Sequence, residues 1–493
     1  MKLTQKWLQR LPAIKKISPY LVLGIILFFH LFGLTTVPNG LYIDEYSIAD
    51  SAAHLATNWH DEQGRFLPLF VQNNGDYKQP VFVYSVAILF KIFGVSTLVL
   101  KLTSVFYFMA SLIVFYLILQ KLFKDPRVQL FGLLLFGFLP QYWLMSREAF
   151  EVVSAIFFTV LSTYFLFQTF EWNMHKLFAV RARFAALSGV SLGLLVYAYS
   201  TTRVFAALLI LIAALLYSKK YWREILIIGA SFGILLLPLI PILLGSDALT
   251  NRFDMISYLG NTYGYSPVEK LMIGITEFSK YWSTEYLIIR GDSNLRHGSG
   301  WGGILTSTGL FLVLIGLTGS FLKRRSLDDL RTMNQLNKSP NIRIFWFVIL
   351  SAIAAVIPAA LTFEGTPHAL RSVALGFYLV LIALYGLNTL LQLNKQFLYR
   401  TLQVLLVLEI SLYVIFYFSF YPAKAYGSFA TPNLDKGISQ AVNNGCKKIQ
   451  IKQYGTDQYL LDFYSRAHQV VVLDNDQAVP DNCVVTNNLN LGL

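Results

Sequence analysis

The chain has 493 residues, of which 55% are hydrophobic and only 14% are charged. Apolar runs of helix-spanning length recur from end to end, so the composition excludes a soluble globular protein and a disordered one. The formal net charge of +13 would suggest nucleic-acid binding in a soluble protein. Here Lys and Arg gather in short loops between apolar runs, which is typical of membrane topology, and we expect no nucleic-acid partner.

The basic N-terminal segment "MKLTQKWLQRLPAIKK" precedes an apolar run from Tyr20 to Leu34. We expect this run to be a retained first span that starts in the cytoplasm. The basic loops "QKLFKDPR", "HKLFAVRAR", "SKKYWRE", "LKRRSLDDLR" and "NKQFLYR" then all fall on the cytoplasmic side. Ten further spans are predicted near residues 98–120, 128–146, 151–170, 185–200, 204–218, 225–244, 302–322, 343–362, 370–392 and 401–420.

The segment "PVFVYSVAILFKIFG", residues 80–94, is also apolar. Counting it as a span would place the basic loops outside, so we predict a helix that lies at the outer membrane interface. It belongs to a first outer loop over residues 37–97. A second long outer loop covers residues 245–301.

The composition changes abruptly after residue 420. Residues 1–420 are predicted to form an all-α, polytopic membrane domain of about eleven transmembrane helices, and residues 421–493 a small extracytoplasmic α/β domain. In this tail, "GISQAVNNG" and "TDQYLLDFYSRA" indicate helices, and "KKIQIKQ" and "HQVVVLD" indicate strands. The only two cysteines, Cys446 and Cys483, lie in the tail; a disulfide and two buried thiols both remain open.

Ionisable side chains collect on the predicted outer face. Each has an ordinary explanation: Arg203 and Arg371 can extend to lipid headgroups, and Glu45 can be a charge at a helix N-terminus. Arg147 and Glu151 are expected to share a helical face. Five separate loops nevertheless converge on this side, which predicts a functional site. The candidates are Asp44, Glu45, Asp76, Lys78, Arg147, Glu151, Arg203, Arg296, His297, His368 and Arg371.

The sequence contains no H-x-x-x-H, H-E-x-x-H or cysteine cluster, so no metal and no cofactor are predicted. An all-oxygen cation site of Asp44, Glu45 and Glu151 is conceivable but not favoured. Outside the cytoplasm, activated groups usually arrive on lipids such as polyprenyl phosphates. There a carboxylate can take the proton of an acceptor hydroxyl that attacks an anomeric carbon, while cations stabilise the departing phosphate. One such displacement inverts the anomeric centre.

The acidic pair after the first span, "DYKQPVFVY" in the first outer loop and "SREAFE" at the next outer turn resemble the GT-C glycosyltransferases of the protein O-mannosyltransferase and aminoarabinose-transferase type. "GDSNLRH" and "PHALRS" also look like outer-loop segments of bacterial members. The resemblance covers roughly residues 20–420. It implies a GT-C-like fold, Asp44 as catalytic base with Glu45 as its neighbour, and Lys78 as a ligand of the carrier phosphate. Arg147 and Glu151 would then form a second polar cluster.

The predicted function is transfer of a hexosyl or pentosyl group, with inversion, from a polyprenyl-phosphate donor to a lipid, glycan or protein acceptor outside the cytoplasmic membrane. Arg203 and Arg371 are predicted to bind the carrier phosphate beside Lys78. A transporter or flippase of lipid-linked sugars would need ionisable residues at the bilayer midplane and an internal repeat. A surface-polysaccharide polymerase or ligase would use a large outer loop rich in Arg and His, which residues 245–301 keep possible.

Overall fold

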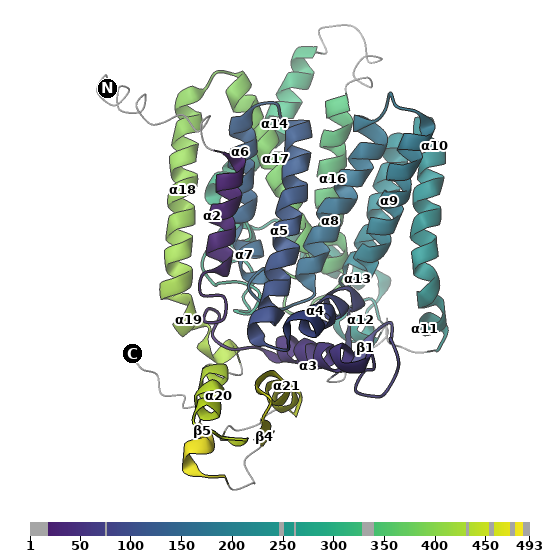
Figure 1. The fold of residues 1–493 in the computed structure, drawn as a ribbon. Helices are drawn as coiled ribbons and strands as arrows, with labels where there is room; N and C mark the ends of the chain where they lie inside the picture. Colours follow the sequence, from purple (N-terminus) through teal and green to yellow (C-terminus); the bar gives the residue numbers. More distant parts are fainter. Residues whose placement is uncertain are drawn as a thin grey trace, which may run out of the picture.

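The structure, a computed structural model, describes residues 18–73, 76–245, 251–260, 263–327, 340–429, 433–452, 458–473 and 479–486. Its body is a bundle of long helices that run side by side (Figure 1). Seven helices in these described ranges are long and apolar enough to cross a membrane, so the chain is a multi-pass membrane protein. The longer bundle helices are α5 (Thr97–Leu122), α8 (Val152–Phe167), α9 (Phe178–Val196), α10 (Thr202–Leu236), α14 (Ser307–Leu327), α16 (Pro340–Ala360), α17 (Val373–Gln392) and α18 (Gln396–Ser419).

Shorter apolar helices complete the bundle. They are α2 (Pro19–Leu31), α6 (Pro126–Gly137) and α7 (Pro140–Met145). Each begins with proline, whose fixed φ and missing N–H suit the first helical position. Helix α17 is almost entirely buried, which makes it the centre of the bundle, whereas most of α18 is exposed to the surroundings.

One predicted span is broken, and two others are joined by a tight reversal. The run predicted over residues 128–146 is broken between Gly137 and Pro140, because proline cannot continue a helix through that position. The spans predicted over residues 204–218 and 225–244 fall in α10 and its continuation through η3 (Leu237–Leu239) into α11 (Ile240–Gly245). The backbone of α10 leaves helical geometry at Tyr221 (φ −122°, ψ 34°). Arg203 lies near the outer-loop residue Gln79, and Leu235 accepts a hydrogen bond from Tyr197 at the same end of α9. Helix α10 therefore reverses at Tyr221, as two antiparallel spans require.

Elements that lie across one end of the bundle build a platform (Figure 1). Helix α4 begins at Pro80, where an interfacial helix was predicted, and it packs against α3. A two-residue gap in the described chain separates strands β1 and β2, which pair antiparallel. The platform elements are α3 (Ile43–Asn58), β1 (Val71–Asn73), β2 (Asp76–Lys78), α4 (Pro80–Phe93), α12 (Asn251–Ile256), α13 (Pro267–Lys280) and the π-helical turn η5 (Glu285–Ile289).

The C-terminal tail lies at the same end as this platform (Figure 1). Within the described residues of the tail, three strands form a parallel sheet in the order β4-β3-β5. Helix α21 packs on α3, and the backbone N–H of Asn433 donates to Asn39 Oδ1 at 2.9 Å. The tail elements are α19 (Tyr421–Lys424), α20 (Leu434–Asn443), β3 (Lys448–Lys452), α21 (Gln458–His468), β4 (Val471–Leu473) and β5 (Val484–Thr486).

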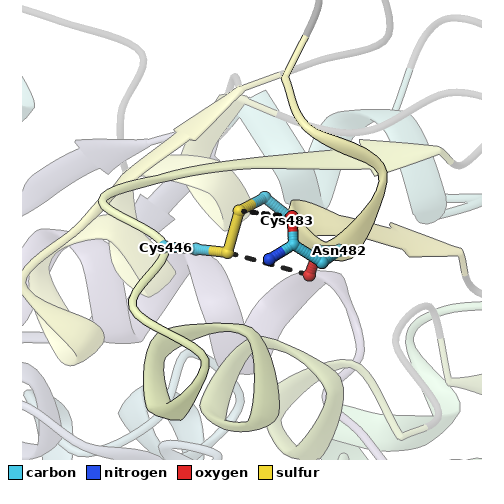
Figure 2. Close-up of a disulfide and its surroundings, with 3 residues drawn as sticks. All are labelled: Cys446, Asn482 and Cys483. Atoms are coloured by element: carbon cyan, nitrogen blue, oxygen red, sulfur yellow. Dashed lines mark hydrogen bonds between the residues drawn. A yellow bond between two sulfur atoms is a disulfide. The ribbon is translucent and has the colours of Figure 1, made fainter.

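The two cysteines are joined in a disulfide, which settles the alternative left open by the sequence. Figure 2 shows the bridge between Cys446 and Cys483 beside Asn482. Cys446 lies just before β3 and Cys483 just before β5. The bond therefore fastens the last strand of the tail to its central strand.

Candidate functional site

A polar cavity of about 530 Å³ opens at the platform end of the bundle. Its walls come from the first outer loop, the starts of α8 and α10, the long loop before α14 and the connection between α16 and α17. Residues far apart in the chain therefore share one chamber. Eight of the residues singled out from the sequence line it: Asp44, Lys78, Glu151, Arg203, Arg296, His297, His368 and Arg371.

Asp44 and Lys78 form an ion pair in the wall of the polar cavity. Asp44 lies in the first turn of α3, and Lys78 is the last residue of β2. The Lys78 Nζ lies 2.8 Å from Asp44 Oδ1. The side chain of Asp44 is 32% exposed, whereas that of Lys78 is only 4% exposed. The carboxylate is thus accessible from the cavity, with a buried ammonium behind it.

Gln79 connects two other charged residues of the wall. Its backbone N–H donates to Glu151 Oε1, and its side-chain Oε1 accepts a hydrogen bond from Arg203 Nη2 at 3.0 Å. The Arg203 guanidinium also lies 5.6 Å from the centre of the Phe70 ring. Sequence reasoning missed Gln79, and its position between Lys78 and the helix-starting Pro80 was the available signal. The residue ties the start of α4 to the starts of α8 and α10.

Arg371 is fixed by the segment that precedes it. Its Nη1 donates to Thr362 Oγ1 and to the Glu364 carbonyl oxygen, both at 2.8 Å. Its Nη2 lies 3.4 Å from Glu364 Oε2. The side chain is only 8% exposed. Arg371 is therefore a preorganised cation of the cavity wall, which differs from a side chain extended to lipid headgroups.

The long loop and the α16–α17 connection bring two histidines to one carboxylate. Asp292, which sequence reasoning missed, has its Oδ2 atom 3.6 Å from the Nδ1 of His297 and 3.5 Å from the Nδ1 of His368. Burial alone would raise the pKa of Asp292, but the two imidazoles outweigh it and hold the pKa below its usual value. Arg296 lies nearby with its guanidinium 5.6 Å from the centre of the Tyr42 ring. All four ionisable residues line the polar cavity.

Glu45 does not line the polar cavity, in contrast to the expectation that it acts beside Asp44. It is fully buried, and it accepts hydrogen bonds from the backbone N–H groups of Tyr42 at 3.1 Å and Ala149 at 2.8 Å. Burial raises its pKa. Glu45 therefore joins the start of α3 to the turn between α7 and α8, and so positions Asp44.

A buried polar layer behind Asp44 was not found from the sequence. Glu148 is 1% exposed, and burial together with the charge of Glu45 raises its pKa well above the usual value. Lys101 of α5 is also buried and donates to the carbonyl oxygens of Pro38 at 3.2 Å and Gly40 at 3.3 Å. Lys101 was overlooked because it lies inside an apolar run. Its hydrogen bonds hold the segment that leads into α3.

Arg147 has a different place from the one predicted. Residues 146–151 form a turn rather than a helix, so Arg147 and Glu151 do not share a helical face. The guanidinium is fully buried. It donates to carbonyl groups in the last turn of α2 and in the segment that follows this helix. Such carbonyls have no partner inside a helix, and the arginine satisfies them. The acceptors are the oxygens of Phe29, His30, Phe32 and Val37.

Asp76 is the first residue of β2 and pairs in register with Asn73. Its side chain lies outside the part of the structure that is described.

The architecture is similar to a solved structure of the aminoarabinose transferase ArnT from Cupriavidus metallidurans, bound to undecaprenyl phosphate. The match has a TM-score of 0.55 at 12% sequence identity and covers 95% of this chain and 89% of that chain. The chain has the GT-C fold. The GT-C resemblance predicted from the sequence is therefore confirmed at the level of fold.

Another GT-C structure is less similar. The oligosaccharyltransferase AglB from Archaeoglobus fulgidus, in complex with an inhibitory peptide and a dolichol-phosphate, matches with 14% identity and a TM-score of 0.48 over 94% of this chain and 65% of that chain. This TM-score is too low to support the fold assignment. No protein-family model matches the sequence, and no curated protein matches it.

Proposed function

We propose that this protein transfers a sugar from a polyprenyl-phosphate donor to an acceptor outside the cytoplasm, with inversion of the anomeric centre. One observation carries the proposal: the accessible carboxylate of Asp44 is ion-paired to the buried Lys78 in a cavity that also contains Arg203, Arg296 and Arg371. A proton acceptor and a group of cations are the two components that displacement of a phosphate requires.

The reaction would proceed in one step. The acceptor oxygen attacks the anomeric carbon, and its proton passes to Asp44 Oδ. The bond between the anomeric carbon and the phosphate oxygen breaks, and the polyprenyl phosphate leaves with the bonding electrons. Because the carrier phosphate is already a good leaving group, no general acid is needed. Attack from the face opposite the phosphate inverts the centre.

The cations of the wall would stabilise the charge that develops on the departing phosphate. An ammonium has three donor hydrogens, so Lys78 can keep its bond to Asp44 and still donate to a phosphate oxygen. Arg203 and Arg371 are held by polar partners from neighbouring segments, which spares them reorganisation during the reaction. A polyprenyl carrier is supported by the fold, because the ArnT structure of the same fold is bound to undecaprenyl phosphate.

The end of the bundle that carries the polar cavity is proposed to face the exterior. The loops predicted to be cytoplasmic contact one another at two places. Arg127 donates to Gln396 at 3.0 Å, and Arg181 pairs with Glu224 at 2.8 Å. Each contact joins two of the basic loops, as expected if these loops share one side of the membrane.

The direct test is to mix purified protein with candidate polyprenyl-phosphate sugars and a mixture of envelope acceptors, and to follow the lipid products. Release of polyprenyl monophosphate is expected. Release of a polyprenyl diphosphate from a diphosphate-linked donor would favour the polymerase or ligase. Donor movement across vesicles without any release would favour the flippase.

A further inference from the structure

Asp292, His297 and His368 form a cluster whose spacing is unusual for hydrogen bonds. The Nδ1 atoms of His297 and His368 lie 3.6 and 3.5 Å from Asp292 Oδ2. The two imidazole rings are stacked, with centroids 4.7 Å apart. One ligand atom from each of the three residues lies within 4.8 Å of the others.

These separations fit a shared metal ion better than direct contacts. An N–H···O hydrogen bond normally spans about 2.7–3.2 Å. Two ligands bound to one zinc ion at bond lengths of about 2.0–2.1 Å and a tetrahedral angle are about 3.4 Å apart. The Nδ1 of His297 is buried, and its contact with Asp292 Oδ2 at 3.6 Å is longer than a normal hydrogen bond. Buried polar atoms usually have a closer partner than this.

The backbone around the cluster holds its carboxylate in place. Asp292 Oδ1 accepts from the N–H of Asn294 at 2.9 Å, and Oδ2 accepts from the N–H of Ala369 at 2.8 Å. A Cβ atom at Gly298 would lie 2.6 Å from the Asp292 carbonyl oxygen, so the tight loop requires glycine there. Hydrogen bonds of this kind commonly orient metal ligands.

We propose that Asp292, His297 and His368 bind one divalent cation of the zinc class in the wall of the polar cavity. Two imidazoles and one carboxylate are a common ligand set for zinc, and three protein ligands leave a fourth position for water or a substrate oxygen. All three residues line the cavity, so this position is on the side where a phosphate would bind. The sequence did not reveal the site, because His368 is distant in the chain from the other two ligands.

Metal binding is tested independently of sugar transfer. The full chain is purified in detergent without a histidine tag, stripped with a chelator, dialysed against zinc and analysed for metal content. About one zinc per chain is expected in the wild type, and loss of it in Asp292→Asn and His297→Ala. His175→Ala is the matched control, because His175 is exposed and lies in another loop. Absence of zinc from the wild type, or equal zinc in all four proteins, would overturn the proposal.

A second variant keeps the test informative if the first ones misfold. Both natural cysteines are in the disulfide, so His368→Cys introduces a single free thiol. After cobalt is added, this variant should show a sulfur-to-cobalt charge-transfer band that the wild type lacks. His175→Cys is the control and should show none. A cobalt spectrum of His368→Cys without that band, in protein with a normal thermal transition, would contradict the site.

Discussion

Lys78 is bound to the carboxylate that the proposed mechanism uses as base, and its side chain is nearly inaccessible from solvent. If it also holds the carrier phosphate, Lys78→Ala should raise the KM for the donor more than the KM for the acceptor. Lys91→Ala is the matched control, because Lys91 lies at the exposed end of α4. Steady-state kinetics with each substrate varied in turn would check this. A donor KM equal to that of the wild type would remove Lys78 from phosphate binding.

Asp50 of α3 predicts a pH dependence of stability. Burial, followed by the charge of Glu62, raises its pKa to about 8. Its other charged neighbours are His54 on α3 and Asp462 and Arg466 on α21. In the unfolded chain an aspartate ionises near pH 4. The folded state therefore holds a proton on Asp50 that the unfolded chain releases. The free energy of unfolding that this proton contributes is fully present in acid and is lost as the pH rises from about 4 to about 8.

Asp50→Asn stays neutral throughout this range. The wild-type Tm should consequently fall more between pH 5 and pH 8 than the Tm of the variant, when both are measured in the same detergent. Asp435→Asn is a useful control, because this aspartate pairs with His468 and is much more exposed. Identical pH slopes for wild type and Asp50→Asn would show that the buried carboxyl does not hold its proton.

At the residue scale, the sequence identified polar side chains but not their directions. Asp44, Lys78 and Arg371 belong to predicted outer segments next to apolar runs, which is why they were found. Arg147 has the same sequence signature, yet it serves the end of α2. Asp292 was missed because it becomes distinctive only when His368 lies beside it. Such long-range proximity depends on the packing of helices and is not encoded in local spacing.

At the element scale, most helices were predictable because an apolar run of sufficient length has few alternatives in lipid. The interfacial α4 followed from the alternation of loop charge. The break between α6 and α7 was harder to predict, because hydrophobicity averages over it. The reversal within α10 was predicted, since the basic segment "SKKYWRE" that separates the two expected spans contains Tyr221.

Close helix packing at Gly386 predicts a specific effect of a single methyl group. A Cβ atom there would collide with the Leu312 carbonyl oxygen, and one at Gly316 would collide with that of Ile382, so α14 and α17 touch backbone to backbone. Gly386→Ala should destabilise the protein by about 1–3 kcal/mol through overpacking. Thermal unfolding in detergent measures it.

Gly229→Ala provides the contrast, since a Cβ at this helical position meets nothing within 4 Å. It should leave the Tm unchanged or raise it slightly, because alanine favours helix over glycine by about 1 kcal/mol. If both variants melted at the wild-type temperature, α14 and α17 could not be in backbone contact.

At the scale of the whole molecule, the tail and the bundle are joined by contacts between α21 and α3 and by the link from Asn433 to Asn39. The disulfide closes a loop with a sequence separation of 37, which the chain-entropy model credits with about 3–4 kcal/mol. The Cys446→Ala/Cys483→Ala double variant should therefore have a tail that is cut faster by protease. Its sugar transfer should persist, because the polar cavity is built by residues before 372. Unchanged proteolysis, or complete loss of transfer, would contradict this division of roles.

The fold and the clustering of charged residues at one end could be predicted. The lengths of the apolar runs and the charges of the loops between them can be read along the whole sequence. The donor sugar and the acceptor could not, because they depend on the shape of the cavity. The proposed mechanism depends most on Asp44, as the base of an inverting transfer.

The most direct test is the rate of polyprenyl phosphate release in a single turnover by Asp44→Asn, with donor binding measured on the same protein. The amide keeps the shape of the side chain but cannot accept the proton. We therefore predict a rate lower by about 10²–10⁴-fold with donor affinity retained. Glu45→Gln, which alters only the support behind α3, should be milder. Release by Asp44→Asn at close to the wild-type rate would show that Asp44 is not the base.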